Sequence, residues 1–296
     1  MDSGLIIINK AAGMTSHDVV NAIRKIMKTK KVGHSGTLDP MATGVLNVFV
    51  GQATKTIRFH QEPFKRYRGR MRLGYESDTL DAWGKVVAVK GHREVSWDAI
   101  QGVIPQFTGE ISQIPPMFSA LRHQGKRLYE LARQGVEVDR PPRKIQIREL
   151  TIKPVEKDLF ELEIQCSKGT YIRTLMDDIA IALNTRGIMT SLTRLESDGY
   201  TLEEAASLEA VAKKMAKGDT SFLIPMAALF PERPVVALTP EDFLDLKHGK
   251  TPSLEPFDGL TRLLYRGRLV AIGDRRASGN VICQRFLREA ENGSPI

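Results

Sequence analysis

One stretch of the chain surrounds a single carboxylate with residues that stiffen and open the backbone. In 33–45, which reads GHSGTLDPMATGV, three glycines and a proline flank Asp39. Glycine lets a ligand approach the main chain closely, and the proline that follows Asp39 holds that aspartate out of helical geometry. The apolar run 45–50 follows at once and predicts a buried strand. We therefore expect a stiff loop that presents a carboxylate, although an ordinary turn with a solvated aspartate has the same composition.

Two other segments carry residues suited to an anionic partner or to a base. The segment 65–73 alternates basic and apolar residues, which predicts a strand. Arg66 and Arg68 fall on one face of this strand, and Tyr67 falls on the other, where a plain core position is the simpler interpretation. Further along, Arg173 lies in the first turn of a predicted helix, where the helix N-terminus already carries partial positive charge. Its position indicates a carboxylate or phosphate partner.

The motifs of several chemistries are missing from the sequence. The six histidines are scattered, without HExxH or any other metal-ligand spacing, and there is no Walker loop, no GxGxxG and no GxSxG. We therefore expect no metal site, no nucleotide cofactor and no other cofactor. One aspartate, the tyrosines and one unusually placed arginine remain, and they allow covalent or acid–base catalysis by a single carboxylate.

The positive charge of the chain is concentrated around the same stretch. The formal net charge is +8, and residues 1–72 hold 13 lysines and arginines against 4 acidic residues. The remaining residues hold 30 basic and 31 acidic side chains. A cationic region around a candidate carboxylate favours a polyanionic substrate, nucleic acid first. A solvated basic surface is the alternative for the charge taken alone.

Length and composition predict two domains. A chain of 296 residues is long for one domain, and three prolines in 225–234 mark a boundary, which gives domains of 1–230 and 231–296. No apolar run is long enough for a signal sequence or a membrane span. Cys166 and Cys283 form no CxxC pair and no disulfide framework. We expect a cytoplasmic protein without membrane contact, with a monomer as the default.

Periodicity and turn residues set the expected elements. Alternating strands without regular βαβ spacing favour a largely antiparallel mixed sheet over a doubly wound parallel one. Beyond residue 234 we expect a helix that begins at Thr239-Pro240, a hairpin over 263–270 and a strand over 281–287. The expected strands of the larger unit are 5–9, 45–50, 65–73, 145–150, 160–166 and 189–195, and the helices are 53–60, 96–107, 125–135, 172–183, 202–215 and one that begins at Thr15.

Five ordered blocks resemble the TruB family of tRNA pseudouridine synthases, and the resemblance spans about residues 5–200. The small C-terminal unit, roughly 233–290, resembles the PUA-like RNA-binding domain of that family. One departure is that the first family motif usually has a proline after its lysine, whereas this chain has Lys10-Ala11-Ala12-Gly13. The blocks are 34–46 with the catalytic aspartate, 65–74 with the tyrosine-bearing strand, 77–84, 113–133, and 167–175 with a tyrosine and an arginine.

The resemblance implies a fold and an activity. The fold is α+β (mixed α/β), with a pseudouridine-synthase catalytic domain built on a largely antiparallel mixed sheet and a small C-terminal PUA-like β-barrel. The implied reaction isomerises the T-loop uridine at tRNA position 55. The enzyme breaks the N1–C1′ bond, rotates the uracil and rejoins it through C5 without a cofactor. Which atom Asp39 attacks stays open.

The resemblance also implies roles for individual residues. Asp39 is the essential carboxylate, Arg173 is its partner, and Tyr67 stacks on the uracil and is a candidate base. For any one of the surface cations, a solvated position remains the alternative. The expected substrate-binding residues have three roles. His34 enters the T loop of the tRNA and stacks there, Tyr171 and Leu192 line the pocket, and phosphates are bound by Lys10, Arg66, Arg68 and Lys126.

Two rival functions share these features. A non-catalytic RNA-binding protein could use the same basic surface, with Asp39 in a structural role. An N-glycosidase could also use one carboxylate beside a sugar, and it would release free uracil.

Overall fold

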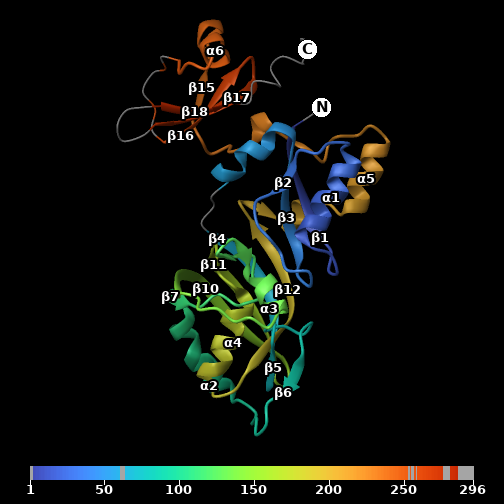
Figure 1. The fold of residues 1–296 in the computed structure, drawn as a ribbon, viewed down its shortest axis with the longest axis vertical. Helices are drawn as coiled ribbons and strands as arrows, with labels where there is room; N and C mark the ends of the chain where they lie inside the picture. The colour runs from blue at the N-terminus through green and yellow to red at the C-terminus, as the bar shows by residue number, and fades with distance from the viewer. Residues whose placement is uncertain are drawn as a thin grey trace.

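The structure is a computed structural model that describes residues 3–60, 64–252, 254, 257, 259–275 and 281–285. Most of these residues belong to two sheets and the helices around them (Figure 1). The helices are α1 Ser16–Ile26, α2 Trp97–Val103, α3 Leu128–Arg133, α4 Ile172–Ala182, α5 Leu208–Ala216 and α6 Pro240–Lys247, with 3₁₀ helices at Gly51–Phe59, Ile104–Phe107, Leu202–Glu204 and Met226–Ala228. The strands are β1 Gly4–Lys10, β2 Val32–His34, β3 Thr43–Val50, β4 Phe64–Leu73, β5 Tyr75–Ser77, β6 Val86–Ala88, β7 Gly109–Gln113, β8 Arg122–His123, β9 Lys126–Arg127, β10 Arg143–Glu156, β11 Leu159–Ser167, β12 Gly187–Ser197, β13 Tyr200–Thr201, β14 Ile224–Pro225, β15 Val235–Ala237, β16 Leu260–Tyr265, β17 Arg268–Arg275 and β18 Val281–Arg285.

A large mixed sheet forms the body of the protein. Its strand order is β14-β1-β3-β12-β4-β11-β10-β7, with β13 beside β12 and β2 beside β3. Among its described pairings only β3 with β12 is parallel, and the others are antiparallel. The expectation of a largely antiparallel mixed sheet is therefore confirmed.

The two faces of β4 separate core from charge as the sequence predicts. Tyr67, Met71 and Leu73 are buried in the main apolar core. On the other face, Arg68 and Arg70 lie directly opposite Glu163 and Glu161 of β11. Opposite charges directly across an antiparallel pair stabilise the sheet modestly. The family resemblance led us to expect that Arg66 and Arg68 bind phosphates of the substrate. In the structure these arginines form ion pairs within the sheet.

Helices α1 and α4 begin and pack as their sequences predict. Thr15 is the N-cap of α1, and its hydroxyl and the Asp18 carboxylate form a reciprocal capping box. The apolar stripe of α4, which includes Leu175 and Ile179, is buried in the main core. In Figure 1, α1 and α5 lie side by side at one edge of the sheet. In the described part of the chain, no helix is long and apolar enough to cross a membrane.

Two predicted helices are shorter or tighter than expected. The prediction of one continuous helix over 202–215 is wrong in its first half, because α5 begins only at Leu208, after a short 3₁₀ helix at Leu202–Glu204. The backbone of Ala206 bonds instead to β1, donating to Ile7 and accepting from Asn9, and Ser207 then caps α5. A backbone that pairs with a strand cannot also continue an α-helix. The segment 53–60 is helical, but it forms a 3₁₀ helix.

The basic helix expected over 125–135 is also only partly present. Residues 122–127 form a short hairpin, β8–β9, with Gln124 and Gly125 at positive φ in its turn. Positive φ at two consecutive residues is typical of tight hairpin turns. Helix α3 therefore begins only at Leu128, and Lys126 lies in the hairpin.

A smaller sheet follows the proline-rich boundary and lies at one end of the molecule (Figure 1). Its order is β15-β16-β17-β18, and the β16–β17 hairpin turns at Arg266 and Gly267, as predicted. Helix α6 begins after the N-cap Thr239, also as predicted. Leu269 and Ile272 pack with residues of β1 and β3, so the two sheets share an apolar cluster. The last two residues of the strand expected over 281–287 lie outside the described residues.

The close parallel contact between β3 and β12 requires a glycine at position 44. This glycine has φ +99°, and a Cβ there would lie 2.2 Å from the carbonyl oxygen of Arg194. Gly199, in the turn after β12, has φ +79°, but a Cβ there would meet no heavy atom within 4 Å. We expect Gly44→Ala to lower the free energy of unfolding by ~1–3 kcal/mol more than Gly199→Ala, since both pay the φ penalty and only the first overlaps a neighbour.

Urea denaturation of the two variants measures this difference. Equal losses of stability would show that the backbone at residue 44 can move away from β12 at little cost.

Candidate active site

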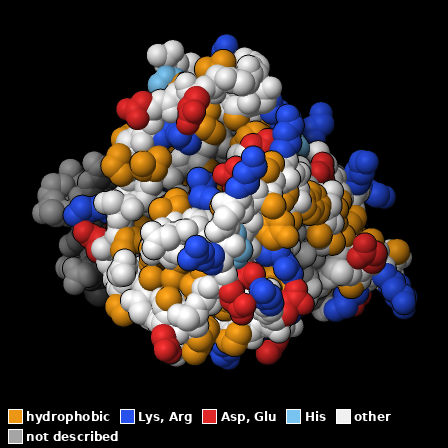
Figure 2. Space-filling view, turned by 90° about the horizontal axis from the view of Figure 1, so that it is seen from below, with side chains coloured by type: hydrophobic (Ala, Val, Ile, Leu, Met, Phe, Trp, Pro, Cys, Tyr) orange, Lys and Arg blue, Asp and Glu red, His pale blue; other side chains and the backbone are white. Residues whose placement is uncertain are grey.

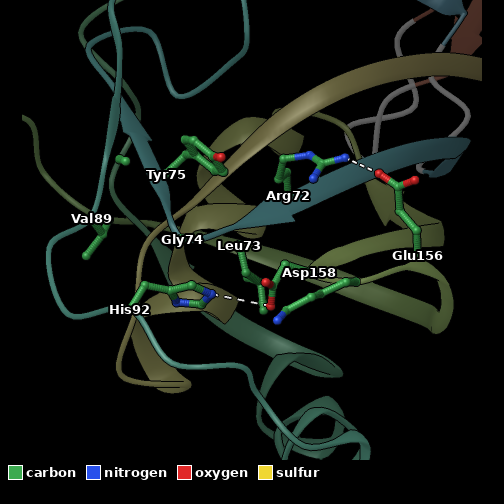
Figure 3. A pocket seen from close by; sticks show the side chains of 10 residues that line it. Arg72, Leu73, Gly74, Tyr75, Val89, His92, Glu156 and Asp158 are labelled. Atoms are coloured by element: carbon green, nitrogen blue, oxygen red, sulfur yellow. Dashed lines mark hydrogen bonds and ion pairs between the residues drawn. The ribbon is translucent and has the colours of Figure 1, made fainter.

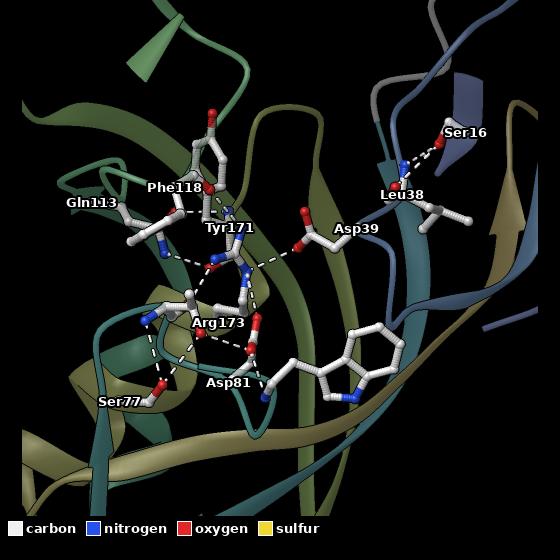
Figure 4. A network of polar contacts seen from close by, with 11 residues as sticks. Ser16, Leu38, Asp39, Ser77, Asp81, Gln113, Phe118, Tyr171 and Arg173 are labelled. Carbon is white, nitrogen blue, oxygen red and sulfur yellow. Dashed lines mark hydrogen bonds and ion pairs between the residues drawn. The ribbon is translucent and has the colours of Figure 1, made fainter. Parts of the chain in front are cut away.

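Asp39 lies in the loop between β2 and β3, and Ser16 at the start of α1 holds that loop. The Ser16 hydroxyl accepts from the Leu38 N–H at 2.8 Å and donates to the Leu38 carbonyl at 3.1 Å (Figure 4). Both groups are buried, so each needs its partner. The residue before Asp39 is therefore fixed by one side chain on both of its backbone polar groups, and the expected stiff loop is confirmed.

Lys10 supports the same loop from inside the protein. Its side chain is fully buried, and Nζ donates to the carbonyls of Ala11, Met14 and Pro40 at 2.9, 2.7 and 3.2 Å. Burial lowers the pKa of Lys10 from 10.5 to about 8. An ammonium has three donors, and all three are used here. We therefore revise the expected phosphate contact of Lys10, which instead stabilises the loop that contains Pro40.

Arg194 on β12 is a second buried cation, and its sequence context predicts no role for it. Its guanidinium donates to the carbonyls of Val45 at 2.7 Å and Gly36 at 3.1 Å, on either side of Asp39. The side chain is 1% exposed. An arginine in an otherwise buried strand is rare unless it is paired, which is the signal that could have identified it.

Arg173 connects Asp39 to two other loops. Its Nε donates to Oδ2 of Asp39 at 2.8 Å, while Nη1 and Nη2 donate to the carbonyls of Thr79 and Phe118. Figure 4 shows the guanidinium between Asp39 and Asp81, whose Oδ2 lies 3.8 Å from Nε. The expected pairing of Arg173 with Asp39 is confirmed. Two carboxylates also offset the cost of an arginine at the N-terminus of α4.

Tyr171 is held at the start of α4 by a side-chain amide. Gln113 at the end of β7 accepts from the Tyr171 N–H at 2.8 Å and donates to its carbonyl at 3.1 Å. Burial raises the pKa of the Tyr171 phenol, which is half-buried. This role of Gln113 is not predicted from the sequence, because a lone glutamine carries no recognisable pattern.

Tyr67 and Leu192 lie on adjacent strands near the same carboxylate. Tyr67 is 9% exposed, and burial raises the pKa of its phenol, to which the Asp39 charge also contributes. Leu192 is buried opposite Gly69, where an added Cβ would lie 3.2 Å from a Leu192 methyl. Tyr67 thus lies within electrostatic reach of Asp39, and the Leu192 carbonyl accepts from the Thr43 hydroxyl at the start of β3.

His34 ends β2, five residues before Asp39. Its ring is half-buried, and Nδ1 accepts from the Gly36 N–H at 3.3 Å. Burial, and then the Arg194 charge, lower the pKa of this imidazole. His34 is therefore neutral at physiological pH, which suits stacking against a base better than binding a phosphate.

Arg66, Arg68 and Lys126 have no hydrogen bond or ion pair with Asp39 or its loop among the described residues. Arg66 pairs with Glu149 at 3.0 Å, and Arg68 pairs with Glu163 at 2.7 Å. Lys126 is exposed in the β8–β9 hairpin. A phosphate at either arginine would have to compete with a carboxylate already in place. Much of the basic surplus of residues 1–72 is thus used within the fold.

The charged surface at the α2 and β5–β6 end is mixed. Figure 2 shows lysines and arginines among acidic and apolar side chains on this face. A cavity of about 480 Å³ lies near the end of β4, and Figure 3 shows His92 and Asp158 in it, with Nε2 and Oδ1 3.3 Å apart. None of the predicted site residues lines this cavity. The described residues contain no group of three or more ligands that could hold a metal ion.

The comparisons with known proteins agree on one family. Residues 24–172 match the model of the TruB family pseudouridylate synthase N-terminal domain. The chain is 40% identical over 281 residues to tRNA pseudouridine synthase B of Streptococcus thermophilus (strain CNRZ 1066), an alignment that covers 93% of this chain and 96% of that protein. It is 41% identical over 289 residues to the protein of the same name from Geotalea uraniireducens (strain Rf4), with 94% and 93% covered. The chain belongs to the TruB family.

Solved structures share the fold of this TruB-family chain. A Cbf5-Nop10-Gar1 complex contains a chain that superposes with a TM-score of 0.70 at 24% identity, covering 96% of this chain and 84% of that one. A second structure, an H/ACA RNP bound to a substrate RNA containing 2′-deoxyuridine, gives a TM-score of 0.66 at 23% identity, with 98% and 81% covered. At these identities the likeness concerns the fold.

The geometry of this TruB-family site leaves one carboxylate oxygen available. Oδ2 of Asp39 accepts from Arg173, whereas Oδ1 has no hydrogen-bond partner among the described residues. The carboxylate is 37% exposed, against 5% for its arginine partner. An oxygen held at a fixed position, facing accessible space, can act as a nucleophile or as a proton acceptor.

Removing the Ser16 hydroxyl should loosen the loop without touching Asp39. Ser16→Ala leaves the buried N–H and C=O of Leu38 unpaired, which costs ~1–3 kcal/mol for each group that water cannot reach. We expect faster hydrogen exchange at the Leu38 amide and a lower free energy of unfolding. Ser112→Ala, at an exposed position of β7, is the control. Unchanged exchange at Leu38 would mean that other contacts suffice to hold the loop.

Proposed function

We propose that this chain is a tRNA pseudouridine synthase that isomerises the T-loop uridine at position 55. The observation that carries the proposal is the Asp39 carboxylate, held on a fixed loop and paired with the buried Arg173. The family supplies the reaction, and relatives named tRNA pseudouridine synthase B align over more than nine-tenths of the chain. The names of these relatives support a tRNA substrate, and the T arm is part of the proposal.

The reaction needs no atoms from outside the substrate. The N1–C1′ bond breaks, the C5–C1′ bond forms, a proton leaves C5, and N1 gains a proton. Asp39 is the catalytic carboxylate, and its free oxygen meets the uridine while Arg173 holds the other oxygen in place. A carboxylate fixed in this way reaches the reacting atom without further ordering.

Tyr67, Tyr171 and Leu192 form the wall that receives the uracil. Because burial raises the pKa of Tyr67, the phenol is neutral at physiological pH, which favours stacking over proton abstraction at C5. Stacking of a base on an aromatic ring is worth ~1–3 kcal/mol. It offsets part of the few kcal/mol that flipping a nucleotide out of its stack costs.

The T loop is recognised at the edge of this pocket. His34, neutral and next to the Asp39 loop, stacks where the flipped nucleotide was. Lys126, exposed in the β8–β9 hairpin, contacts a phosphate, while Arg66 and Arg68 contribute only if their glutamates are displaced. Specificity then rests on the shape and splayed bases of the loop, because phosphate contacts carry no sequence information.

The C-terminal residues 231–296 form a second, PUA-like β-barrel domain that binds RNA, after a catalytic domain of 1–230. The change from the ten-stranded sheet to the separate sheet β15–β18 at this boundary supports the division. The exposed turn of the β16–β17 hairpin carries Arg266, whose guanidinium lies over the ring of Tyr265. The protein works as a monomer in the cytoplasm.

Asp39→Asn tests the catalytic proposal directly. Isomerisation expels the hydrogen at C5, so an RNA stem-loop of the T arm that contains 5-³H-uridine releases tritium as pseudouridine forms. We expect the variant to release tritium at least ~10³-fold more slowly, as for the loss of other single essential catalytic groups. RNA affinity should stay within a few-fold of the wild type.

Asp98→Asn, at an exposed position of α2, is the control and should keep full activity. Release of free uracil by the wild type would favour the N-glycosidase instead. RNA binding without tritium release by the wild type would favour the non-catalytic RNA-binding protein.

Arg266→Glu tests RNA binding by the second domain. If this turn contacts a phosphate, the slope of log affinity against log salt should fall in magnitude by ~1, and binding at low salt should weaken. The melting temperature should change little, because the side chain is exposed. Arg93→Glu, an exposed site before α2 at the other end of the molecule, is the control. An unchanged salt slope for Arg266→Glu would remove this turn from the interface.

A further inference from the structure

Lys65 brings an ammonium to the Asp39 loop from the strand that carries Tyr67. The two residues are two apart on β4 and so face the same side of the sheet, about 7 Å from each other along the strand. Nζ of Lys65 lies 2.6 Å from the point where a Cβ on Gly36 would be. The glycine therefore leaves the space that the ammonium occupies, three residues before the catalytic carboxylate.

This ammonium differs from the buried cations Lys10, Arg173 and Arg194 because its side chain has no partner among the described residues. Lys10, Arg173 and Arg194 use their donors on backbone carbonyls or on Asp39. Arg66, next in sequence, is paired with Glu149. Among the described residues, the Lys65 side chain takes part in no hydrogen bond and no ion pair.

The charges around Lys65 do not supply a counter-ion. The charge of Asp198 raises the pKa of Lys65, but no ion pair joins the two among the described residues, and Oδ2 of Asp198 accepts from the Ser35 hydroxyl at 2.6 Å and the Asn47 amide at 3.2 Å. Cys166 is directly opposite on β11, and burial keeps it a neutral thiol by raising its pKa to about 12. The titratable and charged groups that face Lys65 are Arg194, Asp198, Cys166, Lys168 and His34.

The surroundings make the unpaired cation costly to the free protein. Burial, and then the charge of Arg194, lower the pKa of Lys65 from 10.5 to about 8. A half-buried ammonium beside a second cation is stabilised by an anion that enters from solvent. Within a uridine nucleotide of RNA, the anionic group is the phosphate.

We propose that Lys65 binds the backbone phosphate adjacent to the flipped uridine, so that base and phosphate of one nucleotide are held by Tyr67 and Lys65 on the same strand. The inference rests on the proposed function and goes beyond it by naming the contact that fixes the reacting nucleotide. Gly36 is part of this site, because any side chain there would occupy the position of the ammonium. Lys65 is a substrate-binding residue, and it leaves the chemistry to Asp39.

A double-mutant cycle between protein and RNA tests the contact. The protein variant is Lys65→Met, which keeps the length of the side chain and removes its charge. The RNA variants are T-arm stem-loops with a neutral methylphosphonate at the phosphate on either side of the target uridine. We expect Lys65→Met to weaken RNA binding about tenfold, with little change in the single-turnover rate at saturating RNA. One of the two methylphosphonates should weaken wild-type binding by a similar factor and leave Lys65→Met unaffected.

Wild-type affinity in Lys65→Met, or additive effects of the protein and RNA changes, would overturn the proposal. Lys213→Met, an exposed lysine of α5, is the matched control and should bind like the wild type. Thermal unfolding of each variant shows whether it is folded.

The pH dependence gives a second test that does not rely on Lys65→Met folding. Binding a phosphate requires the protonated ammonium, so wild-type affinity should fall as pH rises through 8 toward 9. Lys65→Arg keeps its positive charge over this pH range, so the part of the affinity loss that comes from deprotonation of residue 65 should be absent. Lys10, whose pKa is also about 8, is present in both proteins. Parallel pH profiles for the two proteins would contradict the contact.

The outcome is separable from the proposed function. Tritium release by the wild type establishes the activity in its own assay, whatever the binding cycle shows. An active wild type with additive binding effects would remove Lys65 from the phosphate site and leave the enzyme assignment intact.

Discussion

The ion pair between Arg173 and Asp39 is the contact on which the site depends. The guanidinium is buried, and it uses separate nitrogens on the Asp39 carboxylate and on the carbonyls of Thr79 and Phe118. It thereby ties the β2–β3 loop to the loops that follow β5 and β7. Removing one partner of such a buried group leaves the other partners unsatisfied, which is far costlier than losing a surface ion pair. The Asp39 carboxylate is thus positioned by the same interaction that joins three loops.

Two further buried cations form hydrogen bonds with backbone carbonyls and no ion pairs with acidic side chains among the described residues. Lys10 and Arg194 donate to carbonyls of the segments before and after Asp39. Carbonyls in a loop lack the regular hydrogen-bond partners of a sheet or helix. Here the long side chains of Lys10 and Arg194 donate to them from inside the protein. The result is a rigid loop without regular secondary structure, in which the carboxylate itself stays partly exposed. The same cations place positive potential under the position where a polyanion binds.

The sequence could predict those features that depend on local pattern. The strand faces of β4, the capping box of α1 and the Arg173 position in α4 all follow from spacing, and the structure has them. Features that depend on distant partners were missed. Arg194 and Gln113 act on backbone groups far away in sequence. The neighbourhood of Gln113 gives no sign of this, and that of Arg194 indicates a paired arginine without indicating its partners. Lys10 was assigned to phosphate from the family resemblance, and nothing in its sequence neighbourhood shows that it is buried. Resemblance to the family supplied the pairing of Asp39 with Arg173, because residue spacing indicated only an anionic partner.

The place of β12 in the sheet has a consequence for how the protein folds. This strand separates β1 and β3 from β4, β11, β10 and β7, and its parallel contact with β3 joins residues about 150 positions apart. Asp39 lies in the loop that leads into β3, on one side of β12. Tyr67 lies on β4, on the other side, and Arg173 lies in α4, which follows β11 in the chain. Until β12 is inserted, the two halves of the active site are joined only by the chain between them. Contacts of such high sequence separation form late, because loop closure must precede them. The sheet that carries both halves of the site is therefore complete only when β12, which ends at Ser197, has paired on both sides.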